Sequence, residues 1–338
     1  MAFELPPGLS PDETLLVDVL DGLAARRLGA AAAVIDETGE MKAEIPDLLA
    51  QHGFLEPLDD LRCTLLLVER LARTSAAVAT LPAGPADACA AAPHVAAARS
   101  AFVDGGAAVT ATIDGFGWRL DGSAARVEWA AESDRFVVVA ETPDGPALFE
   151  VDPFSAGVDL GPRHATTGML GVPVRPVAFE AVRPINGQPA GSESAVRRGR
   201  RHRALTGAAM AVGVSAAAVE AAIAYAGQRH QFGRRLSEFG AVRAMIAAME
   251  ARTVAAATLL WDAVPPGTAQ AGPAAARAAA VAVEAALSVT CDAVQIHGGY
   301  GYMREPPVER CMRDAASIAA RTGGSYGLIE ESAAWLRA

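Results

Sequence analysis

The chain is poor in the cysteine patterns that build disulfide frameworks and zinc sites. Its 338 residues include four cysteines (Cys63, Cys89, Cys291 and Cys311), which are scattered and form no Cys-x-x-Cys pair. Secreted disulfide scaffolds and structural zinc modules need cysteines that are paired or closely spaced. The pattern therefore favours reduced thiols and predicts no metal site.

The chain also lacks an excess of positive charge. Lysine and arginine total 29 against 39 for aspartate and glutamate, which gives a net charge of −10 at pH 7. Nucleic-acid partners demand a basic surface, because each bound phosphate must be neutralised by Lys or Arg. We therefore expect no nucleic-acid partner, although a local basic pocket for a small anion remains compatible with an acidic chain.

Membrane and secretion signals are missing from the sequence as well. The start of the chain carries Glu4, Asp12 and early prolines, without a basic segment followed by an apolar one. The apolar stretches are rich in alanine and interrupted by Arg or Glu, and we find no lipid-facing run of about twenty residues. These absences predict a cytoplasmic protein that makes no membrane contact.

The residues that are abundant predict a large folded core in two or three domains. Apolar residues make up 51% of the chain, and charged residues 20%. Residues 11–92 show the apolar spacing of helices. Residues 98–183 alternate like strands, with Asp-Gly turn signals at Asp114-Gly115, Asp121-Gly122 and Asp144-Gly145. A polar linker at 186–192 precedes a second, longer helical region.

Two motifs stand out within the second helical region. The first is Gln295-Ile296-His297-Gly298-Gly299-Tyr300-Gly301-Tyr302, and the second, upstream, is Arg229-His230-Gln231-Phe232-Gly233. A glycine pair lets another backbone come close, and an arginine offers a fork suited to a pyrophosphate. Taken singly, Gly298-Gly299 also fits a helix C-terminal turn, Arg229 a solvated surface residue, and His297 a packed one.

Together, in this order and behind a strand block, the two motifs resemble the flavin-binding segments of acyl-CoA dehydrogenases. The resemblance implies an α+β multidomain fold with N-terminal helices, a middle β-barrel or sandwich and a C-terminal four-helix bundle. We place the domains at residues 1–95, 96–185 and 186–338, with the first shorter than is usual in the family.

The resemblance also implies an FAD cofactor that is bound mainly by a neighbouring subunit. The implied contacts come from six residues: Arg229 and Gln231 at the pyrophosphate, Phe232 packed beside it, and Gln295, Gly298 and Gly299 near the adenosine half. A charge-assisted contact such as that of Arg229 contributes about 1.5–3 kcal/mol.

The catalytic base of the family has no counterpart at either position where the resemblance places it. In that family a glutamate removes the α proton of an acyl-CoA while the flavin accepts a hydride. One position for this glutamate falls on Thr322, ahead of Gly323, and the other falls on Arg203. Threonine is not a useful base near neutral pH and arginine stays protonated, so we expect no catalytic residue in this chain.

The strand region departs from the family in the part that would hold the flavin ring. A Trp-Ile-Thr or Trp-Ile-Ser run is expected eight residues before an aspartate, with the hydroxyl on the ring. Counting back from Asp134 gives Arg126-Val127-Glu128. The Thr-Glu-Pro…Gly-Ser-Asp loop of the family is not recognisable between Leu81 and Val109. The chain keeps the residues it would contribute to a neighbour and lacks those it would use itself.

This asymmetry resembles the non-catalytic subunit of heteromeric (α2β2) acyl-CoA dehydrogenases that shorten steroid side chains in actinobacteria. That function implies a catalytic partner subunit in a heterotetramer, an acyl-CoA substrate and an electron-transfer acceptor. Two alternatives stay open: an active homo-oligomeric dehydrogenase whose base is Glu128 or Glu305, and a non-enzymatic paralogue that binds no flavin.

Overall fold

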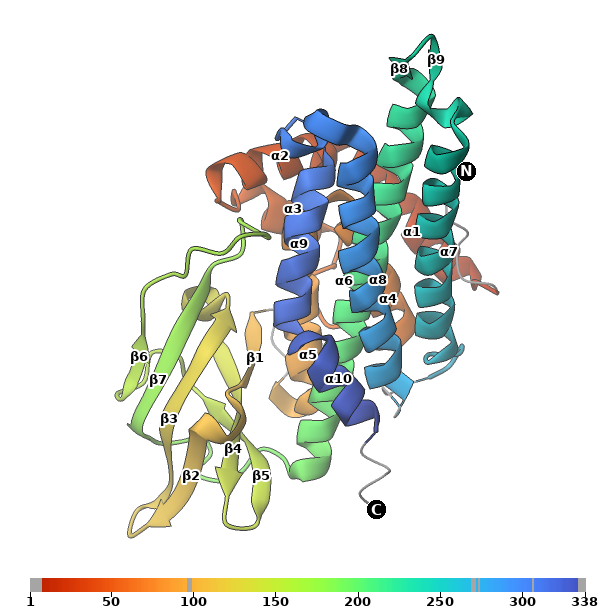
Figure 1. Ribbon diagram of the computed structural model, residues 1–338. Coiled ribbons are helices and arrows are strands. Elements are labelled where there is room, and N and C mark those ends of the chain that lie inside the picture. The colour runs from red at the N-terminus through yellow and green to blue at the C-terminus, as the bar shows by residue number, and fades with distance from the viewer. Residues whose placement is uncertain (1–7, 96–98, 269–271, 273, 306, 334–338) are drawn as a thin grey trace.

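A computed structural model describes residues 8–95, 99–268, 272, 274–305 and 307–333. Figure 1 shows a seven-stranded sheet beside a bundle of long helices, with the N-terminal helices packed against that bundle. The order of helices, then strands, then helices confirms the predicted fold class. The division into domains at residues 95 and 185 stays a prediction.

Some of the N-terminal helices begin at polar caps that the sequence supplies. Ser10 and Glu13 form a reciprocal capping box at the first helix, and the Asp60 carboxylate accepts from the backbone N–H groups of Arg62 and Cys63. The helical segments are α1 (Pro11–Leu23), the π-helix η1 (Ala24–Leu28), α2 (Gly29–Thr38), α3 (Glu44–Gln51), α4 (Leu61–Thr74), α5 (Ala76–Ala91) and the 3₁₀ turn η2 (Pro93–Val95). They confirm the helical reading of residues 11–92.

The strands form one mixed sheet around an apolar core of their own. They are β1 (Ser100–Asp104), β2 (Val109–Asp114), β3 (Gly117–Glu128), β4 (Arg135–Thr142), β5 (Gly145–Val151), β6 (Val158–Leu160) and β7 (Val174–Val182), with 3₁₀ turns η3 (Gly106–Ala108) and η4 (Ala130–Glu132). The order is β1-β4-β2-β3-β7-β6, and β5 pairs with β4. This topology places the end of β3 and the start of β7 next to each other.

Two of the predicted Asp-Gly turns are confirmed and one is wrong. Asp114-Gly115 connects β2 to β3, and Asp144-Gly145 lies at the β4–β5 hairpin. Asp121-Gly122 instead lies inside β3, where the pairing with β7 shifts register between Leu120 and Gly122. Gly122 has φ of +121°, so the glycine serves a β-bulge within a continuous strand rather than a turn between two strands.

The C-terminal region is built on one long central helix. Its segments are α6 (Glu193–Gln228), the hairpin strands β8 (His230–Gln231) and β9 (Arg234–Arg235), η5 (Leu236–Glu238), α7 (Gly240–Asp262), α8 (Ala274–His297), η6 (Gly298–Tyr302), α9 (Pro307–Arg321) and α10 (Gly324–Ser332). Helix α6 packs on α4 and α5 on one side and on α7, α8 and α9 on the other. The long bundle core includes Met249 and Trp261.

Three helical stretches are long and apolar enough to cross a membrane by length and composition: 193–228, 240–262 and 274–302. The expectation that the sequence holds no such stretch is therefore wrong on this measure, because alanine and valine raise the mean hydropathy despite the interrupting charges. In α6, 72% of the apolar window is buried inside the fold, and in α7 only 28%. Packing therefore accounts for the apolar surface of α6, whereas α7 keeps an apolar face at the surface.

Candidate functional site

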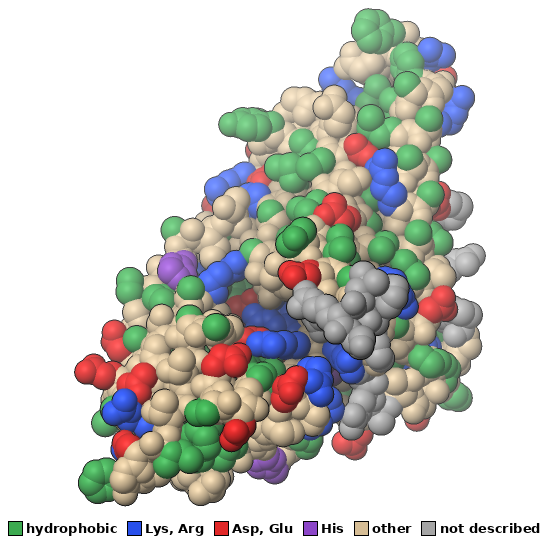
Figure 2. All heavy atoms as spheres, turned by 60° about the horizontal axis from the view of Figure 1, so that its bottom comes forward, with side chains coloured by type: hydrophobic (Ala, Val, Ile, Leu, Met, Phe, Trp, Pro, Cys, Tyr) green, Lys and Arg blue, Asp and Glu red, His purple; other side chains and the backbone are tan. Residues whose placement is uncertain are grey.

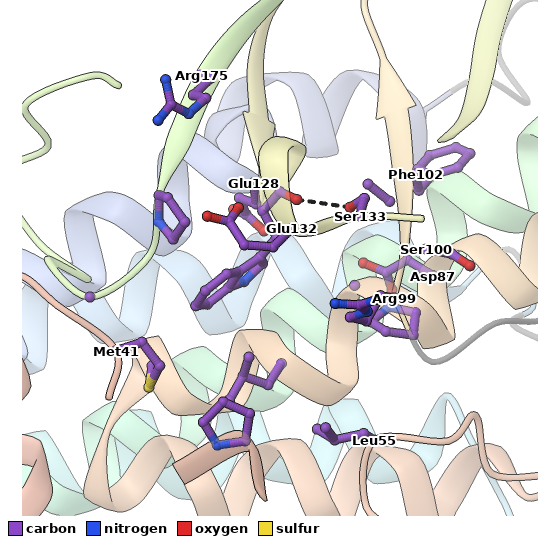
Figure 3. Close-up of a pocket in the computed structure, with 18 of the residues that line it drawn as sticks. Met41, Leu55, Asp87, Arg99, Ser100, Phe102, Glu128, Glu132, Ser133 and Arg175 are labelled. Carbon is purple, nitrogen blue, oxygen red and sulfur yellow. Dashed lines mark hydrogen bonds between the residues drawn. The ribbon is translucent and has the colours of Figure 1, made fainter. Parts of the chain in front are cut away.

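A cavity lies where the N-terminal helices, the sheet and the C-terminal helices meet. Its volume is about 520 Å³, and its lining is mostly apolar. Leu55, Leu81 and Trp129 contribute apolar surface, while Glu128, Arg203 and Arg321 contribute charge. Figure 3 shows this junction cavity with Asp87 and Phe102 on one side and Arg175 on the other. Figure 2 shows acidic and basic side chains gathered at the junction of the sheet and the helices.

Arg321, the last residue of α9, turns inward and joins three parts of the fold. Its Nη2 donates to Asp87 on α5 at 2.6 Å, and its Nε donates to Glu128 at the end of β3 at 3.1 Å. Nη1 donates to the Thr206 hydroxyl on α6 at 3.2 Å. The side chains of Arg321 and Asp87 are each 1% exposed. We call Asp87, Glu128 and Arg321 the charge cluster.

The charge cluster keeps Asp87 ionised in spite of its burial. Burial alone would raise the pKa of this carboxyl, but the nearby Arg321 and then His202 outweigh it, so the pKa of Asp87 is lowered. His202 Nδ1 lies 2.8 Å from Asp87 Oδ1, and the Thr206 hydroxyl donates to the same oxygen at 3.0 Å. Each oxygen of this buried carboxylate therefore has a partner within the protein.

Arg203 lines the same cavity but has no carboxylate partner of its own. Its Nε donates to the main-chain oxygen of Arg321 at 3.3 Å, and its Nη1 donates to that of Phe102 at 3.0 Å. No ion pair joins it to any described carboxylate. Burial and then the neighbouring Arg321 lower the pKa of Arg203. The guanidinium is thus a half-buried cation held by main-chain oxygens.

Thr322, the other predicted base position, does not line the junction cavity. Its hydroxyl donates to the main-chain oxygens of Ile318 and Ala319, so it is engaged with its own helix. The structure brings Glu128 and Arg203 together and adds Arg321, which sequence reasoning missed. The pair of Arg321 and Glu128 left one signal in the sequence. An arginine stands directly before Thr322, and a carboxylate stands at Glu128.

The six predicted flavin contacts gather elsewhere, at the end of the bundle where α6 and α8 finish. Figure 1 shows the β8–β9 hairpin projecting at this end of the molecule. The Arg229 guanidinium lies 5.5 Å from the centre of the Tyr300 ring, and Tyr225 stacks on His297 with ring centres 4.2 Å apart. These contacts join the two motifs. All six predicted residues (Arg229, Gln231, Phe232, Gln295, Gly298 and Gly299) are exposed, and we call them the exposed motif.

The backbone of the exposed motif includes a non-glycine residue at positive φ. Phe232 and Gly233 form the two-residue turn of the hairpin with φ of +50° and +80°, and Phe232 is 94% exposed. A bulky aromatic at positive φ is strained, and such strain concentrates at functional sites. A Cβ added at Gly298 or Gly299 would meet nothing within 4 Å. The space above these glycines is open to another molecule.

His297 is buried and hydrogen-bonded to its own helix, as the packed reading of the sequence expected. Its Nδ1 lies 2.8 Å from the main-chain oxygen of Ala293, and burial lowers the pKa of the ring. Among the residues that the structure describes, no group of three His, Cys, Asp or Glu side chains could hold a metal ion.

Comparison with known proteins shows a likeness to acyl-CoA dehydrogenases. The family profile "Acyl-CoA dehydrogenase, C-terminal domain" matches residues 191–331. A Mycobacterium tuberculosis protein named "probable acyl-CoA dehydrogenase FadE25" is 35% identical over 217 residues, which is 61% of this chain and 56% of that protein. Butyryl-CoA dehydrogenase from Megasphaera elsdenii superimposes with a TM-score of 0.86 at 24% identity, and the match covers 100% of each chain. Residues 191–331 therefore match the C-terminal domain of acyl-CoA dehydrogenases, and the whole chain shares the fold of these solved structures.

The acyl-CoA dehydrogenase homologues are FAD flavoproteins. A glutaryl-CoA dehydrogenase from Mycobacterium smegmatis, solved in complex with FADH2, superimposes with a TM-score of 0.84 at 17% identity and covers 97% of this chain and 95% of its own. The sequence match to the curated relative FadE25 spans little more than half of its length. Whether this chain shares the cofactor of the family must therefore be judged from its own residues.

The junction cavity does not fit a flavin ring, whereas the exposed motif fits the outer part of the dinucleotide. Glu128, which the sequence resemblance places where a hydroxyl would face the ring, is a carboxylate bound by Arg321. A negative charge there opposes the electron-rich reduced ring. Arg229, in contrast, is exposed and paired with no described carboxylate, and Gly299 leaves room for close approach.

Proposed function

We propose that this chain is the non-catalytic subunit of a heteromeric FAD-dependent acyl-CoA dehydrogenase. Its exposed motif would contact the outer part of an FAD that is held mainly by a catalytic partner subunit. The substrate of the complex is an acyl-CoA thioester, which is dehydrogenated between its α and β carbons. The electrons then pass to an electron-transfer acceptor.

The observation that carries the proposal is the state of the two base positions. Arg203 is a cation, and the hydroxyl of Thr322 is bound to its own helix. Removal of a proton next to a thioester needs an acceptor, and a positioned base is worth about 10²–10⁴-fold in rate. Neither group can act in this way, which supports a base supplied by a different chain.

The exposed motif gives independent support for a partner. Arginine is suited to a pyrophosphate because its planar fork can donate two parallel hydrogen bonds to phosphate oxygens. Open glycines let main-chain N–H groups point at a bound anion. Arg229 and Gly299 are both exposed, and within the described part of the chain the Arg229 guanidinium contacts the Tyr300 ring but forms no ion pair with a carboxylate.

The choice of partner and of acyl chain follows from the sequence resemblance. We propose a heterotetramer of two copies of this chain with two catalytic subunits, since closed symmetric assemblies are the common solution for such enzymes. The acyl side chain of a steroid is the substrate class that the resemblance suggests. A cytoplasmic location accords with this reaction.

A second candidate is an active homo-oligomer, because Glu128 does line the junction cavity. Its Oε2 accepts from Arg321 at 3.1 Å, which occupies the carboxylate that would have to receive the proton. The other alternative base, Glu305, is exposed in the segment after η6 and does not line the cavity. The heteromer is therefore the function that we favour.

Flavin stoichiometry tests the proposal. The chain would be purified alone and after co-expression with acyl-CoA dehydrogenase homologues encoded beside it, and flavin absorbance and complex mass would be measured. We expect little flavin on the chain alone and one flavin for each pair of unlike chains in the complex. Full flavin occupancy in a homo-oligomer would overturn the proposal. A colourless complex would favour the non-enzymatic paralogue.

A further inference from the structure

The junction cavity retains the volume and lining of a ligand site even though its charges do not suit a flavin ring. Its volume of about 520 Å³ falls within the roughly 300–1,000 Å³ of small-molecule sites. Such sites combine an apolar wall with a few polar groups that fix orientation. Here Leu81 and Trp129 belong to the wall, and Arg203 is a cation whose hydrogen bonds go to main-chain oxygens.

Arginines outnumber carboxylates among the described residues that line the cavity, which are Arg99, Arg163, Arg175, Arg203 and Arg321 against Glu40, Asp87, Glu128 and Glu132. Arg321 is shared by two carboxylates, Asp87 and Glu128, while Arg200 binds Asp104 with both nitrogens of its fork. Arg203 is left with main-chain oxygens alone, and its Nη2 has no acceptor among the described residues. This nitrogen can therefore donate to a bound ligand.

The nature of this cation restricts the ligand that could neutralise it. A guanidinium fork pairs with a planar carboxylate through two parallel hydrogen bonds. A doubly charged phosphate at Arg203 would be repelled by the nearby carboxylates of Glu128 and Asp87 more strongly than a carboxylate that carries one charge. Arg163 and Arg175 also line the cavity without an ion pair to a described carboxylate. The apolar wall suits the hydrocarbon part of such a ligand.

We propose that the junction cavity binds an organic monocarboxylate, with its carboxylate on Arg203 and its hydrocarbon body against Leu81 and Trp129. The ligand is either a free carboxylic acid or the terminal carboxylate of an acyl chain whose other end is a CoA thioester. The site belongs to this chain alone and does not depend on flavin or on the proposed partner.

Calorimetric titration of the purified full-length chain tests this site. Hexanoate would be compared with hexanamide, and adipoyl-CoA, which ends in a carboxylate, with hexanoyl-CoA, which does not. We expect the carboxylate to bind about tenfold to a hundredfold more tightly than its neutral match in at least one pair. Preference in the first pair identifies a free acid, and preference in the second alone identifies the CoA-linked carboxylate. Equal affinity within both pairs, or no binding, overturns the proposal.

Substitution assigns the preference to Arg203. Arg203→Met should abolish the difference in affinity between the carboxylate and its neutral counterpart. Arg203→Lys should keep part of that difference, and it provides the test if Arg203→Met does not fold. Arg99→Met is the matched control, because Arg99 lines the same cavity but is held by Asp134 through both oxygens. A full preference surviving in Arg203→Met would overturn the assignment. Since flavin content is measured separately in the complex, failure here is distinguishable from failure of the proposed function.

Discussion

The exposed motif and the junction cavity contain the same residue types in opposite environments. At the exposed motif, Arg229 has only an aromatic ring beside it and Phe232 points into solvent at a strained φ. At the junction cavity, Arg321 has hydrogen-bond partners at all three of its nitrogens. Polar groups whose hydrogen bonds are made within the protein need no ligand, whereas unpaired polar groups and strained residues at the surface are typical of binding sites. The contrast indicates that the exposed motif faces another molecule, whereas the charge cluster beside the cavity is satisfied by the protein itself.

The largest expected effect concerns catalysis. The chain alone should oxidise no acyl-CoA, because the missing base removes about 10²–10⁴-fold and the ring position is also altered. Thr322→Glu or Arg203→Glu should not restore turnover by itself, since Glu128 and Arg321 still occupy the place of the ring. Turnover would be measured with acyl-CoA thioesters and an artificial electron acceptor, with the co-expressed complex as the positive control.

Substitution of Glu128 and Glu305 tests whether the catalytic base lies in this chain. In the complex, Glu128→Gln and Glu305→Gln should leave most of the turnover, whereas removing the glutamate of the catalytic partner should abolish it. A loss of about a hundredfold or more from either change here, with flavin still bound, would place the base in this chain and support the homo-oligomer.

The next effect tests how strongly the charge cluster stabilises the fold. Arg321→Met should destabilise the fold by about 3–5 kcal/mol, because it leaves the buried carboxylates of Asp87 and Glu128 without their shared cation. Urea unfolding followed by circular dichroism measures this loss. The control is Arg99→Met, which breaks an ion pair with Asp134 that is exposed and should cost about 0–1 kcal/mol. Equal losses in the two variants would mean that the cluster has no special structural role.

The sequence predicted the architecture and the exposed motif but not the charge cluster. Helical spacing and Asp-Gly turns are local patterns, so the helices, the linker and the β4–β5 hairpin could be read directly. Arg321, Glu128 and Asp87 lie far apart in the chain and meet only through the packing of α9, β3 and α5. No local sequence pattern predicts contacts between residues so far apart in the chain. Counting from family motifs identified Glu128 as unusual, but its partner emerged only from the structure.

A smaller effect concerns the exposed motif. Arg229→Ala should weaken flavin retention in the complex by about 1.5–3 kcal/mol, near tenfold to a hundredfold, while leaving the fold intact. Arg229→Lys should rescue only part of this loss, because a point charge cannot make the paired contact. Flavin content after dialysis measures the effect. Arg243→Ala, also on the surface near this end, is the control. Unchanged flavin in Arg229→Ala would show that the residue is an ordinary surface charge.

The smallest effect compares two buried carboxylates that the fold treats in opposite ways. Asp87 is paired with Arg321 and its pKa is lowered, whereas burial raises the pKa of Asp314 on α9 to about 6 from an ordinary 3.8. Asp314 Oδ1 accepts one hydrogen bond, from the Met169 N–H at 2.6 Å. No cation forms an ion pair with this carboxylate among the described residues. Asp87 is therefore buried as a charged carboxylate beside Arg321, whereas burial of Asp314 favours its protonated form.

The consequence of Asp314 for stability has a definite sign. Between about pH 4 and pH 6 the folded chain holds a proton that the unfolded chain has released, so this residue makes the fold less stable as pH rises through that window. Asp314→Asn keeps the oxygen that accepts from Met169 but cannot ionise. The variant should therefore be more stable than the parent at pH 7, by on the order of 1 kcal/mol or more, and the gap should shrink towards pH 4. Urea midpoints at pH 4.5, 5.5 and 7 would measure the gap. Asp134→Asn, at an exposed pair, should show no such trend, and a gap that widens on acidification would refute this account of Asp314.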